Sequence, residues 1–335
     1  MKARFRRRSG RRGAVLALLL VLLSASPPCA SSAVAQLRRP VRIGGVSESW
    51  GPTPQLVGLR DGLVELGYRE PDDFVLGVRF TQGDFRGLPA VTREFIQQGV
   101  DVLVLGSTSA LNAATAIAPK TPVIFVASVD PVTLGAVRSY ARPGANLTGV
   151  TNEDVELSPK RLELLRSLVP GLKRVLFAYD AGNTASALEV KAYREAGRTL
   201  GIELVERSLR TQADAQRTFA RLRKADAQAI LAPFAVTLNI PSFLIEAAAR
   251  LQLPTMFHDR FYVEHGGLAS YGVNLYESGR QAARLLDKVI RGVQPGDIPI
   301  EANNRVEFVV SASVARAINL SISRDLIPRI DRVLE

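Results

Sequence analysis

Residues 101–131 read DVLVLGSTSALNAATAIAPKTPVIFVASVDP, and this stretch decides the fold. Its first apolar run, Val102–Leu105, has no polar alternation, as expected of a parallel strand buried on both faces. A polar triplet at 107–109 precedes an alanine-rich stretch, which favours a helix that begins at the triplet. A second apolar run, Val123–Ala127, leads into a turn that contains Asp130. The stretch therefore predicts strand, helix and strand, with small polar residues where each strand ends.

The rest of the chain repeats this alternation in two halves, separated near residues 144–150. In the first half we expect strands at 41–46 and 74–80 and helices at 55–66 and 88–98. In the second half we expect helices at 159–168, 185–200, 213–223 and 240–251 and strands at 174–179, 202–206, 229–232 and 255–258. A strand at 268–272, a helix at 278–291, a strand at 306–310 and a final helix follow. Repeated βαβ units imply a mostly parallel sheet with right-handed crossovers in each half.

The charge of the chain is concentrated at its beginning. The 335 residues carry a formal net charge of +11, but seven positive residues precede residue 13 and no acid precedes Glu48. The remainder has only a mild positive excess, which argues against nucleic acid as a partner. With 47% hydrophobic and 22% charged residues, the chain has the composition of a globular protein large enough for two domains.

The basic beginning predicts a secretory signal peptide. It precedes an apolar run at 14–23 that is too short to span a bilayer, and then the small-residue site Ala33-Val34-Ala35. We expect cleavage after Ala35 and a periplasmic mature protein; an uncleaved anchor and lipidation at Cys29 are the alternatives. Whether export follows the general or the twin-arginine route stays open. Cys29 is the only cysteine, so the mature chain can form no disulfide.

Short motifs spread along residues 41–323 carry a resemblance to a known family. They are LVELGY at 63–68, the turn at Thr108, PVIF at 122–125, DPV at 130–132, RPGANLTG at 142–149, KRLELL at 160–165, VP at 169–170, YG at 271–272, GRQAA at 279–283 and DIP at 297–299. In this order and spacing, the chain resembles the periplasmic substrate-binding proteins of ABC transporters with the type I fold, in particular the group with tryptophan- and phenylalanine-binding members.

The resemblance implies an α/β fold of two doubly wound parallel-sheet lobes joined by a multi-strand hinge. Lobe I would hold residues 36–155 and 274–298, and lobe II residues 156–273 and 299–335. A ligand would lie between the lobes, held by residues at strand ends. The carried-over ligand-binding residues are Ser47, Glu48, Ser107, Thr108, Ser109 and Asp130 of lobe I, Tyr179, Asn183, Thr184, Phe234 and Thr237 of lobe II, and Asn274 near the hinge. At this last position relatives often carry Asp.

The implied function is capture of a small solute, either an amino acid or another small polar or aromatic molecule. The protein would be a monomer without cofactor or metal, would not be an enzyme, and would deliver its ligand to an ABC permease in the inner membrane. A binding protein that serves a sensor fits the same sequence. A secreted hydrolase needs a nucleophile motif, but the turn at 106–110 lacks the second glycine of G-x-S-x-G. His258 and His265 have no common metal-binding spacing.

Overall fold

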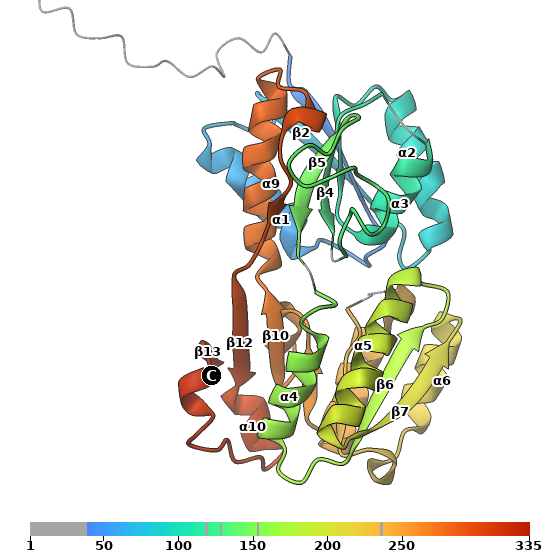
Figure 1. Cartoon of the computed structure of the whole chain (residues 1–335), viewed down its shortest axis with the longest axis vertical. Coiled ribbons are helices and arrows are strands. Elements are labelled where there is room, and N and C mark those ends of the chain that lie inside the picture. The colour runs from blue at the N-terminus through green and yellow to red at the C-terminus, as the bar shows by residue number, and fades with distance from the viewer. Residues whose placement is uncertain (1–38, 118–119, 128, 153, 235–236) are drawn as a thin grey trace, which may run out of the picture.

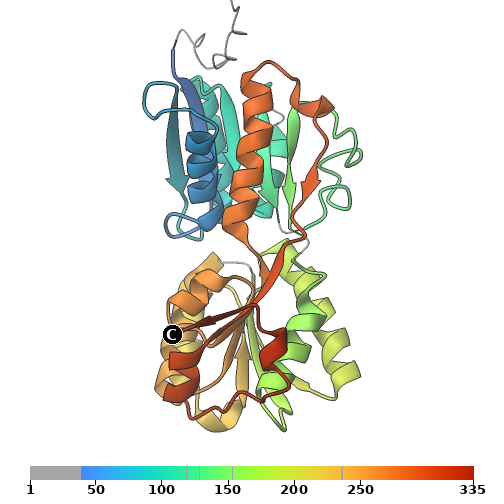
Figure 2. The same cartoon turned by 90° about the vertical axis from the view of Figure 1, so that its left-hand side faces the viewer.

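The computed structural model describes residues 39–117, 120–127, 129–152, 154–234 and 237–335. Two lobes lie one above the other along the long axis (Figures 1 and 2). The predicted signal peptide and its cleavage site at Ala35 lie outside the described residues. Among the described residues, no helix is both long and apolar enough to cross a membrane.

The first lobe is built on a six-stranded parallel sheet with the order β11-β5-β4-β3-β1-β2. Its strands are β1 (Val41–Ser47), β2 (Phe74–Phe80), β3 (Val102–Leu105), β4 (Val123–Ala127), β5 (Leu147–Thr151) and β11 (Glu301–Ala302). Its helices are α1 (Pro54–Glu65), α2 (Leu88–Gln97), α3 (Thr108–Ile117) and α9 (Leu275–Ile290). Separate apolar clusters cover the two faces, as a doubly wound sheet requires.

The second lobe is built on a seven-stranded sheet with the order β13-β12-β10-β9-β8-β6-β7, parallel except between β10 and β12. Its strands are β6 (Arg174–Asp180), β7 (Glu203–Leu209), β8 (Ala229–Leu231), β9 (Thr255–Phe257), β10 (Ala269–Val273), β12 (Val306–Ser311) and β13 (Arg332–Leu334). Its helices are α4 (Ser158–Leu168), α5 (Thr184–Leu200), α6 (Gln212–Arg221), α7 (Ile240–Leu251), α8 (Arg260–Glu264) and α10 (Ala312–Ala317). This architecture confirms the predicted fold class.

The chain passes between the two sheets three times: after β5, between β10 and α9, and between β11 and β12. Polar side chains join these passages, because Ser278 donates to Asn152 (2.7 Å) and the Asn303 amide donates to Ser278 (2.8 Å) and to the Asn274 carbonyl (3.0 Å). Lobe I was expected to end at residue 298, but β11 pairs with β5 in the first sheet. We therefore propose that the last passage lies at residues 303–305.

Helices α1 and α9 pack against each other on one side of the first lobe (Figure 1). Their approach depends on small residues: a Cβ at Gly58 would lie 2.0 Å from the Tyr276 carbonyl oxygen, and one at Gly279 would lie 2.0 Å from the Gln55 carbonyl oxygen. The predicted helix start at 278 was three residues late, because Asn274 caps α9 by accepting from the Glu277 amide (3.2 Å).

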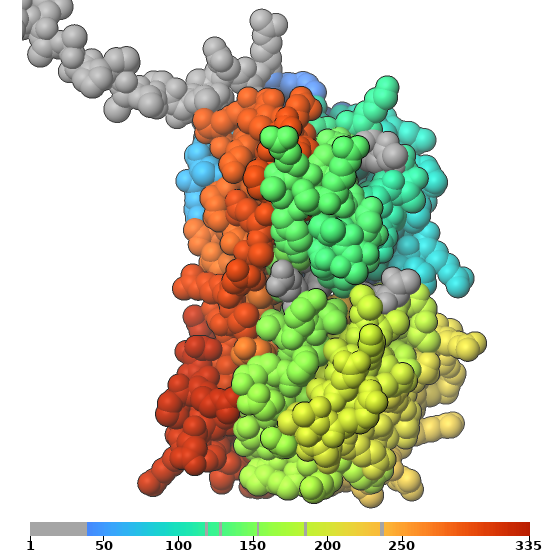
Figure 3. Space-filling view, viewed as in Figure 1, coloured from blue at the N-terminus to red at the C-terminus, as the bar shows by residue number. Residues whose placement is uncertain are grey.

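The lobes also touch each other away from the hinge. The Phe85 ring of the first lobe lies 3.3 Å from the position of a Cβ at Gly182 in the second, and Val129 packs against Phe234. In the space-filling view the lobes meet along a crease (Figure 3). The lobes are therefore closed on each other, with apolar contacts across the boundary.

Candidate functional site

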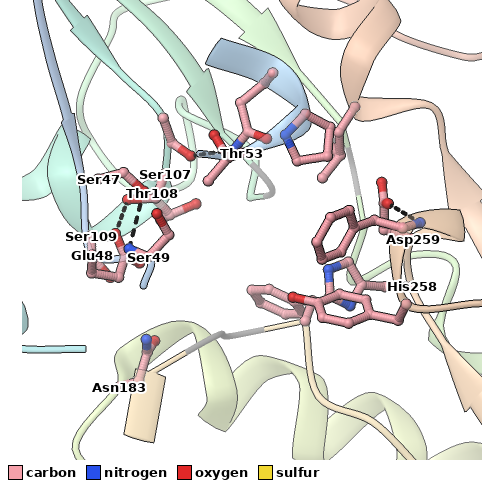
Figure 4. Close-up of a pocket in the computed structure, with 17 residues that line it drawn as sticks. Ser47, Glu48, Ser49, Thr53, Ser107, Thr108, Ser109, Asn183, His258 and Asp259 are labelled. Atoms are coloured by element: carbon pink, nitrogen blue, oxygen red, sulfur yellow. Dashed lines mark hydrogen bonds between the residues drawn. The ribbon is translucent and has the colours of Figure 1, made fainter. Parts of the chain in front are cut away.

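A cavity of about 90 Å³ lies between the lobes, at the carboxyl ends of strands from both sheets. We call it the interlobe cavity; its polar lining is shown in Figure 4. The sequence predicted seven of its lining residues: Ser47, Glu48, Ser107, Thr108, Ser109, Asn183 and Phe234. It did not assign the other ten: Ser49, Thr53, Pro54, Gln55, Gly106, His258, Asp259, Phe261, Tyr262 and Leu275.

The first-lobe wall centres on a buried carboxyl group. Glu48 follows β1, is 5% exposed, and accepts a hydrogen bond from the Ser107 hydroxyl. Burial raises the pKa of Glu48, although hydrogen bonds from Ser107 and Ser109 act against that rise. The Ser107 hydroxyl also accepts from the Ala110 amide (3.1 Å), so Ser107 caps α3. The helix begins at Thr108, within the polar triplet where the sequence predicted its start, and its positive end lies beside Glu48.

The start of α1 supplies the rest of that wall. The Gln55 side chain donates to the Gly106 carbonyl (2.8 Å), which fixes α1 to the turn after β3. The Gln55 Oε1 and Thr53 Oγ1 atoms are buried and have no hydrogen-bond partner in the part of the chain that the structure describes. These two oxygens are therefore unsatisfied acceptors within the first-lobe wall.

The second-lobe wall contains a second buried carboxyl group. Asp259 lies just after β9, is 4% exposed, and caps α8 by accepting from the Phe261 amide (2.7 Å). Burial raises its pKa to about 7, against the effect of that hydrogen bond. The cavity thus has one buried acid on each lobe, whereas no Lys or Arg is among its described lining residues.

Aromatic rings complete the second-lobe wall. Tyr262 stacks on Phe257, with ring centroids 5.0 Å apart, and meets the edge of Phe261 at 5.4 Å. His258 lies 5.3 Å from Tyr262, centroid to centroid. Burial lowers the pKa of His258 to about 3, and the nearby positive charge of Arg161 contributes, so the imidazole is neutral.

A more open pocket of about 300 Å³, whose lining includes Arg260 and Glu264, adjoins the interlobe cavity on its hinge side. The two share Thr53, Pro54, Asp259 and Phe261 as walls. The space available to a ligand therefore continues towards the hinge, past the Phe261 ring.

Three predicted residues, Asp130, Tyr179 and Asn274, are not among the described residues of the cavity wall. The Asp130 carboxylate is bonded within its own turn, to the Val132 amide (3.0 Å) and to the Thr133 amide (3.1 Å). Tyr179 packs on Phe177, with centroids 5.8 Å apart. Asn274 caps α9 in the hinge and borders only the adjoining cavity. The side chains of Thr184 and Thr237 lie outside the described part of the structure.

Local sequence signals could have identified some of the cavity residues that were not predicted. Asp259 begins the sequence DRFYVE, in which an acid before an aromatic run is typical of a helix cap, but the short α8 was not predicted. Pro54 at the first helical position marks the start of α1. The start of α1 faces α8 across the cleft. This arrangement joins distant parts of the chain, so no local sequence pattern predicts it.

Comparison with known proteins identifies the family of the chain. A model of the family described as ABC transporter substrate binding protein matches residues 52–333. A tyrosine-binding protein of Clostridioides difficile (strain R20291) is 24% identical over 264 residues, which cover 78% of this chain and 76% of that protein.

Two solved structures share the fold. A conserved domain protein of Vibrio cholerae is 22% identical with a TM-score of 0.78, and a Streptococcus pneumoniae ABC domain in complex with L-Trp is 21% identical with a TM-score of 0.77. Each likeness covers 88% of this chain and all of the other. The chain has the type I two-lobed fold and belongs to the family of ABC transporter substrate binding proteins.

Proposed function

We propose that this protein is an extracytoplasmic solute-binding protein that holds an aromatic amino acid between its lobes and delivers it to an ABC permease. The observation that carries the proposal is the pair of buried carboxyl groups, Glu48 and Asp259, which line one cavity from opposite lobes without Lys or Arg among the described wall residues. A ligand with an ammonium group would pair with these acids and offset the cost of burying them.

The remaining wall suits the other parts of such a ligand. The unpaired oxygens of Thr53 and Gln55 accept hydrogen bonds from an ammonium group. The start of α3 offers backbone N–H groups and a positive dipole end to a carboxylate. The rings of Phe234, Phe261 and Tyr262 offer flat apolar surface to an aromatic side chain. The relatives that bind tyrosine and L-Trp support this choice of ligand class.

The proposed mechanism is a hinged trap. An open form would admit the ligand, and only the closed form would bring Glu48 and Asp259 to the same molecule. Because the ligand gains contacts from the second lobe only on closure, binding shifts the equilibrium towards the closed form. The permease would then recognise the closed form.

A ligand screen tests the central claim. We expect L-tyrosine, L-tryptophan or L-phenylalanine at 100 times its dissociation constant to add about 2.7 kcal/mol to the free energy of unfolding. The N-acetyl derivative of the same amino acid should give a much smaller shift, because it lacks the ammonium group. Thermal-shift measurements followed by calorimetry check both expectations. Equal shifts with the two compounds would contradict recognition by the buried acids, and stabilisation by sugars alone would overturn the ligand class.

The affinity for an ammonium-bearing ligand should depend on pH through Asp259. Its pKa is raised to about 7 in the empty protein, and only the ionised carboxylate pairs with an ammonium group. Affinity should therefore rise about tenfold as the pH increases from 6 to 8, with release of a proton on binding near pH 7. Calorimetry in two buffers of different ionisation enthalpy measures that proton.

The Asp259→Asn variant is the control for this pH dependence. It should bind more weakly and should lose most of the dependence between pH 6 and 8. The free energy of unfolding without ligand depends on pH in the opposite direction to the affinity. Neutral Asp259 contributes stability that is fully present below the unfolded pKa near 3.8 and is lost as the pH rises through about 7. An affinity that is constant from pH 6 to 8 in the unaltered protein would contradict the role of Asp259.

Delivery to a permease is tested in cells. Deletion of the gene should reduce uptake of the radiolabelled ligand, and a plasmid copy should restore it. Unchanged uptake together with a lost response to the ligand would favour a sensor partner instead.

A further inference from the structure

Glu189 is a buried acid of the second lobe that the proposed function does not use. It lies in α5 and is 0% exposed. The Phe234 backbone amide donates to its carboxyl group, with the nitrogen 3.2 Å from Oε1 and 3.3 Å from Oε2. Phe234 lines the interlobe cavity, whereas Glu189 is not among the described lining residues. Glu189 therefore contacts the cavity wall without bordering the cavity itself.

The segment after β8 depends on this contact for its backbone hydrogen bonding. The Ala232 amide, just after the strand, still donates to the Met256 carbonyl of β9 (2.9 Å). Pro233 then has no N–H group, so the ladder of hydrogen bonds cannot continue there. The next amide, that of Phe234, is buried and needs an acceptor, which Glu189 supplies from α5. A side chain and not the sheet therefore holds the backbone of Phe234.

Phe234 has contacts in both lobes. It is 9% exposed and packs against Val129, which follows β4 in the first lobe. In the proposed function its ring also forms part of the surface that receives an aromatic side chain. Binding residues must be held in place by the residues that support them. A displacement of Phe234 would alter the ligand surface and the contact between the lobes together.

A fully buried acid is a costly acceptor for one amide. Acids are almost never fully buried unless they are paired, and burial raises the pKa of Glu189 to about 8, against the effect of the Arg161 charge. The carboxyl group is mostly neutral at pH 7, and it keeps an acceptor oxygen in either state. An apolar side chain would avoid this cost but would leave the Phe234 amide unpaired. The acid thus favours a role in placing Phe234 over a role in packing.

We propose that Glu189 is a positioning residue for ligand binding: its carboxyl group fixes Phe234, so that the ring is in place to pack on the aromatic side chain of the ligand. This inference rests on the proposed function and adds the residue that preorganises its aromatic wall. Glu189 acts through Phe234 and does not touch the ligand. Preorganisation raises affinity because the ring is ordered before the ligand binds.

A double-mutant cycle at pH 7 tests whether Glu189 acts through Phe234. L-tyrosine, L-tryptophan and L-phenylalanine are titrated by calorimetry into the unaltered protein, Glu189→Met, Phe234→Ala and the double variant. For the ligand that binds most tightly, we expect each single substitution to lower the affinity about tenfold and the double variant to match Phe234→Ala. A loss of about a hundredfold in the double variant would mean independent effects and would contradict the proposal. If none of the three ligands binds the unaltered protein, the proposed function and this inference fail together.

Two further variants separate the placement of Phe234 from general stability. Glu189→Gln keeps an acceptor oxygen and has the shape of the neutral carboxyl group, so the affinity should stay within about threefold. Val190→Ala is the matched control, because Val190 is the next residue of α5, is 5% exposed and belongs to the second-lobe core. It should lower the denaturant midpoint and leave the affinity unchanged. A loss of affinity in either variant equal to that of Glu189→Met would contradict the proposal.

Hydrogen exchange of the Phe234 amide is measured without ligand, first in the unaltered protein, so it does not depend on how any variant folds. We expect exchange at least about a hundredfold slower than in an unstructured peptide. In Glu189→Met the same amide should exchange at least about tenfold faster, while the amides of α4 keep their rates. Exchange of the Phe234 amide at the rate of an unstructured peptide in the unaltered protein would overturn this inference and leave the proposed function standing.

Discussion

Replacement of Arg161 by methionine should lower the free energy of unfolding by about 3–5 kcal/mol, the usual result of removing one partner from a buried ion pair. Arg161 and Asp154 are 0% and 1% exposed, and their side chains are 3.0 Å apart. The guanidinium also donates to the Tyr271 carbonyl (2.7 Å) and to the Asp154 carbonyl (2.8 Å). Methionine fills much of the volume but removes the ion pair with Asp154 and the donors to these two carbonyl oxygens in the protein interior.

The loss of stability in Arg161→Met should depend on pH. This dependence distinguishes the effect of the lost charge from the effect of altered packing. Glu189 is fully buried nearby, and burial raises its pKa to about 8 although Arg161 acts to lower it. Without Arg161, Glu189 loses the positive charge that lowers its pKa, so it resists ionisation more strongly. A buried acid with a raised pKa contributes stability at low pH that is lost as the pH rises. The deficit of Arg161→Met should therefore be smaller at pH 5 than at pH 8.

Denaturant unfolding at both pH values measures this effect. The matched control is Arg194→Met, which breaks the exposed pair between Arg194 and Glu206 and should cost at most about 1 kcal/mol. Equal losses in the two variants would show that the buried pair is not important for stability. Arg161 also joins the segment after β5 to β10, and the chain passes between the lobes after each of these strands, so ligand affinity should fall in the same variant.

The comparison of sequence with structure shows which features are local. Periodic apolar runs predicted most helices and strands, because each depends on its own residues and on burial of one face or both. Strand β5 was not predicted: the sequence LTGVT has a central glycine and takes its conformation from pairing with β4. The two-residue β11 is a strand only because Glu301 and Ala302 pair with β5.

The residues of the site also divide into those that local sequence patterns predict and those that depend on long-range contacts. Glu48 and the triplet at 107–109 could be predicted, because they follow strands whose carboxyl ends face the cleft. Asp130 has the same position in the sequence pattern, but nearby amides of its own turn satisfy its carboxylate. Gln55 and Asp259 belong to the cavity only because α1 and α8 approach across two lobes. That approach depends on how the hinge places the lobes, and no short motif specifies it.

Substitution of Gly279 by alanine should reduce both stability and ligand affinity, because it acts on the contact that places α1. A Cβ at this position would lie 2.0 Å from the Gln55 carbonyl oxygen and 2.7 Å from the Leu59 amide nitrogen. Both neighbours are backbone atoms and cannot rotate away, so the helices must separate. Overpacking of a core costs about 1–3 kcal/mol, and we expect the upper end of that range or more.

Gly77→Ala is the matched control for this substitution. Gly77 lies in β2, and its added Cβ would meet its nearest neighbour, the Phe95 ring, at an ordinary 3.6 Å. Its effect on the free energy of unfolding should stay within about 1 kcal/mol, since alanine also reduces the conformational freedom of the unfolded chain. Both variants are compared by denaturant unfolding and by calorimetric titration with the ligand found in the screen.

The effect on affinity follows from the position of Gln55. Its carbonyl receives the clash, while its side chain anchors α1 to the turn after β3 through the Gly106 carbonyl, and the residue lines the interlobe cavity. A shift of α1 therefore moves an acceptor of the proposed ammonium group together with the start of α3. If Gly279→Ala lost stability but kept full affinity, the Gln55 side chain would not contribute to binding, and Glu48 and Asp259 would have to hold the ammonium group without it.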